Sequence, residues 1–597
     1  MKSIADIKAI REQMQSVIQM RTQGVNGKAV GPYKYQILVC GGTGCESSNA
    51  DLIYKNLLAE AKNFGVEDKV QIVKTGCFGF CEKGPIVKVL PEDSFYVEVK
   101  PEDAKDIIAE QVVKGREVKR LLYNKEKKSL EAVEEIQFYQ KQLRIVLRNC
   151  GVINPEDINE YIGRDGYLAL EKALFEMKPE EIVEEIKKSG LRGRGGAGFP
   201  TGFKWEAGMK AQGDEKYVVC NADEGDPGAY MDRSTIEGDP HSVLEAMTIC
   251  GRAIGANKGF IYIRAEYPLA VDRLKIAMAQ AREAGLLGKD ILGSGFDFDI
   301  EIRLGAGAFV CGEETALLRS IEGKRGMPTP KPPFPAQCGL WGKPTVINNV
   351  ETWANIPVIL TKGADWFNKI GTDDSKGTKV FALTGKVNNS GLVEVPMGTT
   401  LREIIFEIGG GIKGGKKFKG VQTGGPSGGI ITEENLDTPI DFGALTRLGS
   451  MMGSGGMIVM DEDDCVVDVA KFYMEFCVDE SCGKCSPCRI GTRQMYSILD
   501  KISRGAGEMD DIQKLKDIGQ AMKSCSLCAL GQSAPNPTLS TITKFEDEYI
   551  AHIKDKRCDS GKCKKLISYV ITDKCIGCGM CARQCPANCI TGEKKMR

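Results

Sequence analysis

The chain has 597 residues, enough for several domains, and a formal net charge of −1 at pH 7. That near-neutral balance excludes broad binding to nucleic acid or to anionic membranes, and no apolar run is long enough for a membrane span. The N-terminal segment lacks the apolar core of a signal peptide, so we expect a cytoplasmic protein. In such a chain 23 cysteines, beside only two histidines, indicate metal binding instead of disulfides.

An N-terminal helix and the first cysteine group occupy the first 120 residues. Residues 1–32 are predicted to form an amphipathic helix and a linker. The motifs CGGTGC and CFGFC follow strand-like runs, and four thiolates on two loops suit a [2Fe–2S] cluster. Structural zinc is the alternative, but zinc more often uses cysteine pairs with two-residue spacing. The expected ligands are Cys40, Cys45, Cys77 and Cys81.

A glycine-rich loop follows a charged stretch. Residues 121–150 are predicted to be a helical linker, and a later helix is expected to open at Pro179 and end at Gly190. The run GRGGAG at 193–198 has the G-x-G-x-x-G spacing of a dinucleotide-binding turn. That turn needs a strand before it and a helix after it, and the segment FPTG at 199–202 is not expected to begin a helix. The glycines instead predict either a plain turn or a loop whose backbone N–H groups approach an anion.

Polar side chains gather in the later loops of residues 190–352. Amides and carboxylates at strand ends suit the hydroxyls of a ribityl or ribose group, lysine suits a phosphate, and exposed aromatic rings stack on flat ligands. Each feature alone is common in ordinary loops. The candidates are Lys204, Asn221, Asp223, Glu224, Asp226, Glu313, Glu314, Lys331, Phe334, Asn348 and Asn349.

The motif ESCGKCSPCRIG has the C-x2-C-x2-C spacing of a [4Fe–4S] cluster with a remote fourth ligand. It supplies Cys482, Cys485 and Cys488. The remote ligand is either Cys525 or Cys528, both in SCSLCALGQ.

The run CIGCGMCARQCP near the C-terminus is the cysteine run of bacterial ferredoxins. Two such runs usually share their ligands between two clusters, but no second run follows here. We therefore expect one [4Fe–4S] cluster and a structural role for Cys589. The expected ligands are Cys575, Cys578, Cys581 and Cys585.

A fourth group lies between the two [4Fe–4S] motifs. AHIKDKRCDSGKC offers His552, Cys558 and Cys563, with Cys465 or Cys525 as a fourth ligand. Such a set, with Cys465 taken as the fourth, predicts a zinc ion that holds the tail to the body of the protein. The alternative is a reduced cysteine pair beside an ordinary histidine. Six scattered cysteines are expected to be small buried hydrophobes: Cys150, Cys220, Cys250, Cys311, Cys338 and Cys477.

These motifs stand in the order of one known family. Residues 33–120 resemble the thioredoxin-like [2Fe–2S] ferredoxins. Residues 150–530 closely resemble the flavoprotein that accepts NADH in respiratory complex I and in soluble NAD-linked hydrogenases and formate dehydrogenases. The shared motifs are GRGGAGFPTGFKW, NADEGDPG, CGEETAL, KPPFPAQ, INNVET and ESCGKCSPCRIG. The resemblance implies that the glycine loop cradles FMN with NADH laid over it, and it selects Cys528 over Cys525.

The resemblance also implies individual contacts, with two departures from the family pattern. Asp226 replaces a glutamate, and Phe309 stands where a tyrosine is usual, so a hydroxyl near the flavin is lost. No catalytic side chain is expected, since hydride passes directly between nicotinamide and FMN. The implied FMN contacts are Gly193, Arg194, Gly195, Lys204, Asn221, Asp223, Glu224, Phe309, Glu313, Asn348 and Asn349. The implied NAD(H) positions are Phe199, Lys204, Asp226, Glu314, Lys331 and Phe334.

The complete arrangement resembles the flavin-bearing beta subunit of a multimeric NAD-dependent, electron-bifurcating [FeFe]-hydrogenase. It implies a hetero-oligomer with an [FeFe]-hydrogenase catalytic subunit, a small [2Fe–2S] subunit and ferredoxin. Because Glu314 and Asp226 would repel a 2′-phosphate, we expect NAD(H) over NADP(H). Alternatives are the same module in an NADP-reducing hydrogenase, an NAD-dependent formate dehydrogenase or a complex I-type NADH dehydrogenase, or a pure electron relay without nucleotide chemistry.

The predicted fold is multidomain α/β. After the N-terminal segment we expect a thioredoxin-like [2Fe–2S] domain at 33–120, the helical linker, and an α/β FMN- and NADH-binding domain at 151–370. Short β runs among many glycines at 371–455 resemble a ubiquitin-like β-grasp domain of the soluble-ligand-binding type. A helical [4Fe–4S] domain at 456–550 is followed by the Cys/His stretch and a single-cluster ferredoxin-like tail at 551–597.

Overall fold

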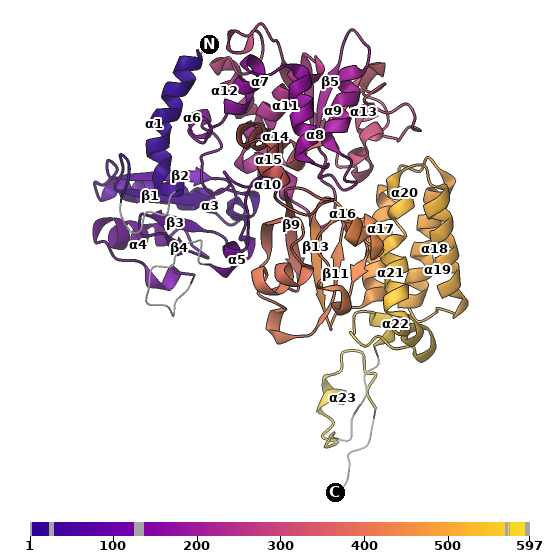
Figure 1. Ribbon diagram of the computed structural model, residues 1–597. Helices are drawn as coiled ribbons and strands as arrows, with labels where there is room; N and C mark the ends of the chain where they lie inside the picture. The colour runs from indigo at the N-terminus through magenta and orange to yellow at the C-terminus, as the bar shows by residue number, and fades with distance from the viewer. Residues whose placement is uncertain (1–2, 23–28, 124–135, 568–570, 572–573, 592–597) are drawn as a thin grey trace.

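The computed structural model describes residues 3–22, 29–123, 136–567, 571 and 574–591. Four bodies follow one another along the chain (Figure 1): an N-terminal α/β unit, a larger α/β domain, a second sheet, and a helical bundle from which the C-terminal segment extends. Within the described ranges, no helix combines the length and the apolar character needed to cross a lipid bilayer.

The N-terminal unit is a four-stranded sheet in the order β2-β1-β3-β4. Strand β1 (Tyr35–Cys40) pairs in parallel with β2 (Val70–Thr75) and antiparallel with β3 (Val87–Leu90), which pairs with β4 (Ser94–Tyr96). Its helices are α2 (Thr43–Glu46), α3 (Ala50–Asn63), α4 (Asp103–Asp106) and the π-helical η2 (Ile107–Val113). Every residue of β1 is buried, because this strand is central and is covered on both faces.

Helix α1 (Ile4–Thr22) joins this unit to the larger domain. Arg21 donates to Glu160 of the larger domain at 2.7 Å and to Gln71 of β2 at 2.9 Å. Both side chains of the Arg21–Glu160 ion pair are buried. Breaking such a pair typically costs about 3–5 kcal/mol. The two bodies are therefore held in one orientation.

The predicted helical linker at 121–150 falls largely on residues 124–135, which lie outside the described residues. Over 136–150 the structure has only one helical turn, α5 (Gln137–Gln140), so the expectation of a continuous helix is wrong there. The N–H groups of Ile145, Val146 and Leu147 each donate to the buried carboxylate of Glu394 at 2.9 Å. In a helix these N–H groups would donate to carbonyls of the preceding turn, and here the Glu394 carboxylate is the acceptor in their place.

The larger domain is built on a parallel sheet in the order β7-β6-β5-β8. The strands are β5 (Tyr217–Ala222), β6 (Lys258–Arg264), β7 (Asp299–Gly305) and β8 (Thr345–Asn349). Its helices are α6 (Ile158–Ile162), α7 (Leu168–Phe175), α8 (Pro179–Ser189), α9 (Thr201–Lys210), α10 (Met231–Gly238), α11 (Pro240–Ile254), α12 (Pro268–Ala284), α13 (Glu314–Ile321), α14 (Val350–Lys362) and α15 (Ala364–Asn368). Helix α8 opens at Pro179 and ends before Gly190, as predicted.

The second sheet has five strands in the order β10-β9-β13-β11-β12. The strands are β9 (Thr378–Gly385), β10 (Gly391–Pro396), β11 (Phe418–Thr423), β12 (Ile430–Ile431) and β13 (Gly456–Asp461). Strand β13 pairs in parallel with β9, and the other neighbours are antiparallel. The π-helical η8 (Glu403–Ile408) and helix α16 (Phe442–Arg447) supply side chains to the same buried core.

The helical bundle contains α17 (Val466–Glu480), α18 (Ser486–Ser503), α19 (Asp510–Cys525), α20 (Ala529–Ser533), α21 (Asn536–Lys544) and α22 (Glu546–Ile550). Met474, Met495 and Leu499 are fully buried where α17 meets α18. After α22 the chain forms the π-helical η12 (Ala551–Asp555) and the 3₁₀ helix η13 (Lys564–Leu566). The C-terminal segment with the short α23 (Met580–Gln584) then extends away from the other bodies (Figure 1).

Candidate functional site

The glycine loop at 191–200 connects α8 to α9 and closes on itself. Arg192 and Pro200 form an isolated antiparallel bridge, and the N–H of Gly193 donates to the carbonyl of Phe199 at 2.8 Å. Gly196 has a φ of 125°, which side chains other than hydrogen rarely allow. Because helix α8 and not a strand precedes the loop, the dinucleotide-binding turn is excluded as predicted.

Helix α9 begins at Thr201, directly after the loop. The expectation that residues 199–202 do not begin a helix is therefore wrong. Pro200 takes the N-cap position with an extended ψ of 122°. An N-cap residue donates no hydrogen bond within its helix, so the N–H that proline lacks is not needed there. The loop thus ends at the N-terminus of a ten-residue helix, where free N–H groups favour negative charge.

The side chain of Arg194 does not point into the loop. Its fully buried guanidinium donates to the carbonyls of Arg192, Lys376 and Thr378 at 2.8, 2.6 and 3.1 Å. It also lies 4.0 Å from the carboxylate of Glu351. Arg194 was expected to contact a flavin, and in this arrangement only its backbone can do so. The guanidinium instead fixes the glycine loop to the second sheet.

The carboxyl ends of β5 and β8 bring the predicted amides together. Asn221 is in register with Asn349, and Cys220 with Asn348. Asn221 donates to the carbonyl of Gly312 at 2.8 Å, and Asn348 accepts from the indole N–H of Trp205 at 3.0 Å. Asn349 donates to Asp232 at 2.5 Å. Each amide is therefore held in one orientation by a neighbouring element.

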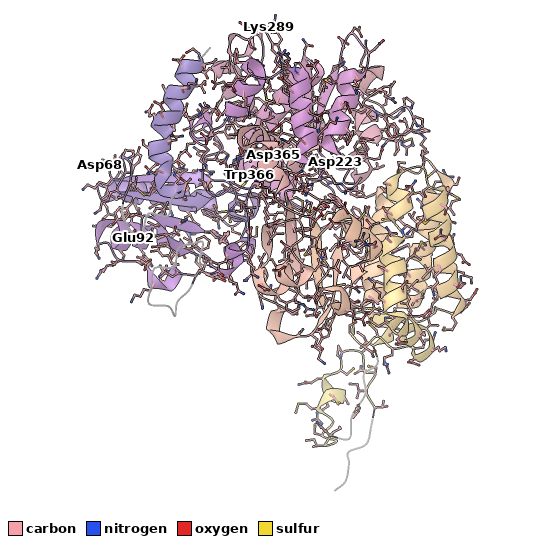
Figure 2. All side chains as sticks on the ribbon, in the orientation of Figure 1. Asp68, Glu92, Asp223, Lys289, Asp365 and Trp366 are labelled. Carbon is pink, nitrogen blue, oxygen red and sulfur yellow. The ribbon has the colours of Figure 1, made fainter. Side chains whose placement is uncertain are left out.

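Asp223 follows the end of β5 and lies at the edge of the larger domain that faces the second sheet (Figure 2). Both of its carboxylate oxygens are buried and without a hydrogen-bond partner among the described residues. Burial raises the pKa of this carboxyl to about 7. A buried acid without a partner is costly in an isolated protein, and it fits a ligand that brings hydroxyl donors.

The neighbouring acids have protein partners. Glu224 accepts from the N–H groups of Asp232 and Arg233 at 3.0 and 3.1 Å, and burial raises its pKa to about 7. Asp226 accepts from the hydroxyl of Ser454 at 2.5 Å, and burial raises its pKa to about 6. Asp226 was expected near the dinucleotide, and the structure instead gives it a partner in the loop before β13.

The loop and the strand ends fit a flavin phosphate, ribityl chain and ring. A Cβ on Gly195 would lie 3.2 Å from the Cβ of Asn349, so a side chain there would crowd the strand edge. Lys204 is held by the carbonyl of Ile347 at 2.9 Å, and burial lowers its pKa. Around this edge of the sheet the glycine loop offers backbone N–H donors, Lys204 offers a positive charge, and the unpartnered Asp223 offers a hydrogen-bond acceptor.

Three of the residues expected around NAD(H) are exposed, namely Phe199, Lys331 and Phe334, whereas Lys204, Asp226 and Glu314 are half-buried. The Lys331 ammonium lies 3.0 Å from the carboxylate of Glu313 and 2.5 Å from that of Glu314. Burial lowers the pKa of Lys331, but the two carboxylates raise it by more, so the pKa lies above its ordinary value. Phe199 and Phe334 are 55% and 54% exposed, which is unusual for phenylalanine and suits stacking on a flat ring.

Phe309 connects this site to the helical bundle. It is the first residue of the short helix η6 (Phe309–Gly312), and Glu313 directly follows that helix. The N–H of Phe309 donates to Glu480 of α17 at 2.7 Å, and its ring packs on Phe476 with 5.2 Å between centroids. Glu313 caps helix α13 by accepting from the N–H groups of Thr315 and Ala316. Glu480 was not found from sequence, because nothing in its local pattern indicates a contact with residue 309.

Four cysteines of the bundle line one small cavity. They are Cys482, Cys485, Cys488 and Cys528, and the cavity is also lined by Val310 and Leu530. Cys525, at the end of α19, is exposed and does not line it. This geometry supports Cys528 as the fourth ligand.

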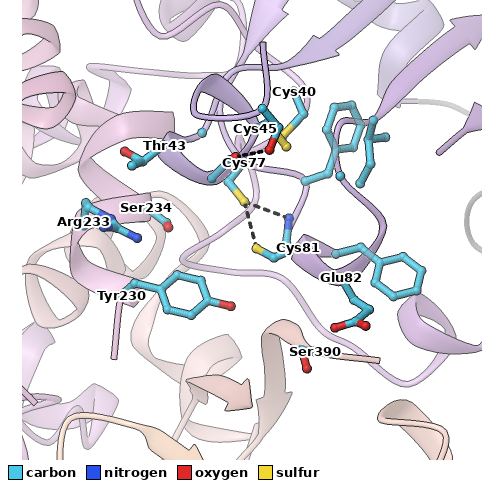
Figure 3. A pocket seen from close by; sticks show the side chains of 18 of the residues that line it. Cys40, Thr43, Cys45, Cys77, Cys81, Glu82, Tyr230, Arg233, Ser234 and Ser390 are labelled. Atoms are coloured by element: carbon cyan, nitrogen blue, oxygen red, sulfur yellow. Dashed lines mark hydrogen bonds between the residues drawn. The ribbon is translucent and has the colours of Figure 1, made fainter. Parts of the chain in front are cut away.

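The four cysteines of the N-terminal unit also converge (Figure 3). Cys40 ends β1, Cys45 lies in α2, Cys77 lies in the loop after β2, and Cys81 begins the 3₁₀ helix η1 (Cys81–Lys83). The sulfurs of Cys77 and Cys81 are 3.8 Å apart. All four line one cavity, together with residues of the larger domain and of the second sheet.

Cys465, His552, Cys558 and Cys563 are all buried, and their ligand atoms lie within 4.8 Å of one another. His552 lies in the π-helical η12 (Ala551–Asp555), and its Nδ1 contacts the carbonyl of Glu548 at 2.7 Å. That contact leaves Nε2 directed at the Cys465 sulfur, 3.3 Å away. A carbonyl behind the ring is the usual support of a metal-binding histidine.

The remaining cysteines lie either in the C-terminal segment or scattered through the other bodies. In the C-terminal segment, the sulfur of Cys585 lies 3.5 Å from the sulfur of Cys589, and a structural role was expected for Cys589. Among the scattered cysteines, five are buried as predicted, but Cys338 is exposed. The prediction for Cys338 is wrong because the loop at 334–343 turns it outward, at a position that hydrophobic pattern alone does not distinguish.

Five family descriptions match successive parts of the chain. They are the thioredoxin-like [2Fe-2S] ferredoxin at 5–111, the Nuo51 FMN-binding domain at 186–358, the SLBB domain at 380–431, the iron-sulfur binding region of NADH-ubiquinone oxidoreductase-F at 468–552, and a 4Fe-4S binding domain at 568–591.

The chain is also similar to complete proteins. It is 61% identical to HndC, a subunit of the NADP-reducing hydrogenase of Solidesulfovibrio fructosivorans, over 76% of this chain and 93% of that one. It is 48% identical to an F-type subunit of the NADH-quinone oxidoreductase of Rhizobium meliloti over 69% of this chain and 98% of that one. A crystal structure of an air-oxidized NAD+-reducing [NiFe]-hydrogenase matches 91% of this chain and 88% of that one, with 28% identity and a TM-score of 0.61.

The fold and the site define an oxidoreductase subunit that has an FMN-binding domain and iron–sulfur domains. The chain belongs to the family of F-type flavin subunits of NADH-quinone oxidoreductases and NAD(P)-reducing hydrogenases.

Replacing Cys528 tests the cysteine set in the bundle. Cys528→Ser should remove about four iron atoms per chain and the EPR signal of one reduced [4Fe–4S] cluster, because serine is a poor ligand for these irons. Cys525→Ser is the matched control and should keep both. Loss of the cluster in Cys525→Ser with retention in Cys528→Ser would reverse the assignment.

Proposed function

We propose that the chain is the flavin subunit of a cytoplasmic NAD(H)-linked hydrogenase complex. Its role is to exchange hydride between NAD(H) and FMN and to pass single electrons through iron–sulfur clusters. The observation that carries this proposal is Asp223, a buried acid at the carboxyl edge of a parallel sheet that has no partner among the described residues. Ligands of such sheets bind beyond that edge, and here the edge also meets the glycine loop and the cysteines of the bundle.

FMN, when bound, would supply the change from two-electron to one-electron transfer. The backbone of Gly193 and Gly195 would approach it closely, while Asn221 and Asp223 would bond its hydroxyl groups. Lys204, which already donates a hydrogen bond to the carbonyl of Ile347, would balance the negative charge of the bound cofactor. No side chain at this edge needs to donate or remove a proton during the hydride step. The protein's part is therefore to align the two rings and to exclude water.

The first electron acceptor is proposed to be a cluster on Cys482, Cys485, Cys488 and Cys528. Helix η6 supports this order, because it begins at Phe309 beside the flavin site and its next residue, Val310, lines the cysteine cavity. Clusters on Cys40, Cys45, Cys77 and Cys81 and on the C-terminal cysteines would complete a set of one [2Fe–2S] and two [4Fe–4S].

The partners are proposed from the resemblance of the whole chain. They are an [FeFe]-hydrogenase catalytic subunit, a small [2Fe–2S] subunit and ferredoxin, with electron bifurcation as the mode of coupling. Similarity to a crystallised NAD+-reducing [NiFe]-hydrogenase supports the hydrogenase assignment at a coarser level. We propose a β-grasp fold for the second sheet and η8, to which the SLBB match lends support. The predicted domain boundaries stay part of the proposal except for the helical linker and for the boundary at residue 455, because β13 (Gly456–Asp461) pairs with β9 and β11 and so belongs to the second sheet.

The test of the function is the complex purified with its native partners. Hydrogen-dependent reduction of NAD+ is expected, and it should increase when oxidised ferredoxin is supplied together with NAD+, because bifurcation couples the two acceptors. Reduction of NAD+ at the same rate with and without ferredoxin would contradict bifurcation. Formate-dependent reduction in place of hydrogen-dependent reduction would contradict the hydrogenase assignment.

An NADP-linked enzyme is the second candidate, favoured by the 61% identity to a subunit of an NADP-reducing hydrogenase. The predicted preference for NAD(H) depends on Glu314, which the structure pairs with Lys331 at 2.5 Å. That pairing both neutralises part of the acid's charge and occupies a lysine that a 2′-phosphate would otherwise attract.

Glu314→Gln tests the nucleotide preference. It should raise kcat/KM for NADPH by about 5- to 150-fold relative to NADH, because one carboxylate is removed and Lys331 is released. The measurement is dye reduction with each nucleotide, and Glu301→Gln, on the exposed face of β7, is the matched control. Equal wild-type rates with both nucleotides, unchanged in Glu314→Gln, would show that this acid does not discriminate.

We further propose that Cys465, His552, Cys558 and Cys563 bind a structural zinc ion. Elemental analysis of protein prepared without chelators should find about one zinc per chain, and His552→Ala should lose it and make the segment after residue 555 more sensitive to protease. Cys338→Ser, which alters an exposed cysteine outside the group, should keep the zinc. A wild-type protein without zinc would end this proposal.

A further inference from the structure

The four cysteines of the N-terminal unit face the larger domain across a cavity of about 350 Å³ (Figure 3). Its far wall is formed by side chains of the α10 region and of the second sheet. These side chains are Tyr230, Arg233, Ser234, Thr384 and Ser390. Three bodies of the protein therefore meet around one set of cysteines.

Contacts beside the cavity fix the cysteines against α10. The N–H of Thr43 donates to the carboxylate of Glu237 at 3.0 Å, and the Thr43 hydroxyl bonds the same carboxylate. A Cβ on Gly76 would lie only 2.4 Å from the Cα of Gly238, so the two backbones touch. Neither the loop that carries Cys77 nor helix α10 can move without losing these contacts.

The hydroxyl of Tyr230 points toward Cys81 (Figure 3), and both residues line the cavity. A phenolic hydroxyl carries a proton that it can donate to a thiolate sulfur. Arg233 lies on the same wall, with its guanidinium over the rings of Tyr230 and Tyr267 at 5.7 and 5.2 Å.

Both side chains are placed by the flavin site. The carboxylate of Glu224 accepts from the N–H groups of Asp232 and Arg233 and so fixes the first turn of α10. Glu224 is itself one of the predicted FMN contacts. Residues 224–233 thus run directly from the flavin edge of the sheet to the cysteine cavity.

We propose that Tyr230 and Arg233 are positioning residues that raise the reduction potential of the [2Fe–2S] cluster on Cys40, Cys45, Cys77 and Cys81. One-electron reduction adds one negative charge to the cluster and its thiolates, and it breaks no bond in the protein. A hydroxyl donor to a cysteine sulfur and a nearby guanidinium both stabilise that added charge. The inference rests on the proposed function, in which FMN is the source of the electron.

A redox titration of the full-length, cofactor-loaded protein tests this, with the EPR signal of the reduced [2Fe–2S] cluster as the readout. Tyr230→Phe keeps the ring and removes the donor, and Arg233→Gln removes the charge. Each should shift the equilibrium about tenfold toward the oxidised cluster, a fall in midpoint potential of about 59 mV for one electron. Arg233→Lys should stay near the wild-type value.

Two matched controls alter the same residue types elsewhere. Tyr217→Phe at the start of β5 and Arg303→Gln on β7 should leave the potential unchanged, since neither lines the cavity. Unchanged potentials in both Tyr230→Phe and Arg233→Gln would overturn the inference alone. Absence of the [2Fe–2S] signal from the wild-type protein would overturn the proposed ligand set as well. If Tyr230→Phe does not retain the cluster, the comparison of Arg233→Gln with Arg233→Lys decides the question.

Discussion

The parallel pairing of β5 with both β6 and β8 is the constraint on which the rest of the site depends. It places the ends of these strands at one edge, so that Asn221, Asp223, Asn348 and Asn349 meet although the two strands are far apart in the chain. The glycine loop reaches the same edge because the guanidinium of Arg194 is buried against the second sheet. A register shift of one residue in β8 would turn its amides to the other face.

Three helices begin around this edge, and each is capped by a residue expected to contact FMN. Glu224 bonds the first turn of α10, Glu313 caps α13, and Asn349 caps α14. Capping satisfies N–H groups that would otherwise lack partners. The same side chains therefore stabilise the fold and are held in fixed orientations at the ligand edge.

Sequence predicts most reliably what depends on covalent spacing. The cysteine motifs of the two cavities follow from spacing, and the strands before the first group follow from apolar runs, but the choice of Cys528 over Cys525 came from the family resemblance. The start and end of α8 follow from Pro179 and Gly190 in the same way. In these cases the pattern that carries the prediction is local, although the cavities themselves are completed by distant segments.

Contacts between distant segments could not be predicted in this way. The bond from Ser454 to Asp226, the Glu394 carboxylate that replaces a helix at 145–147, and the direction of the Arg194 guanidinium all depend on another body of the protein. Tyr230 and Arg233 were missed for the same reason. They lie within five residues after the recognised NADEGDPG motif, and only the approach of the cysteine loop gives them a role.

The central claim is that one polypeptide carries electrons from a nucleotide at the sheet edge to clusters on both sides of it. The most direct measurement is EPR of the purified chain, without partner subunits, frozen after mixing with NADH under anaerobic conditions. The account predicts signals from a reduced [2Fe–2S] cluster and from the [4Fe–4S] cluster of the bundle. Bleaching of the flavin with both clusters still oxidised, although a chemical reductant reduces them at a potential that NADH can reach, would contradict it.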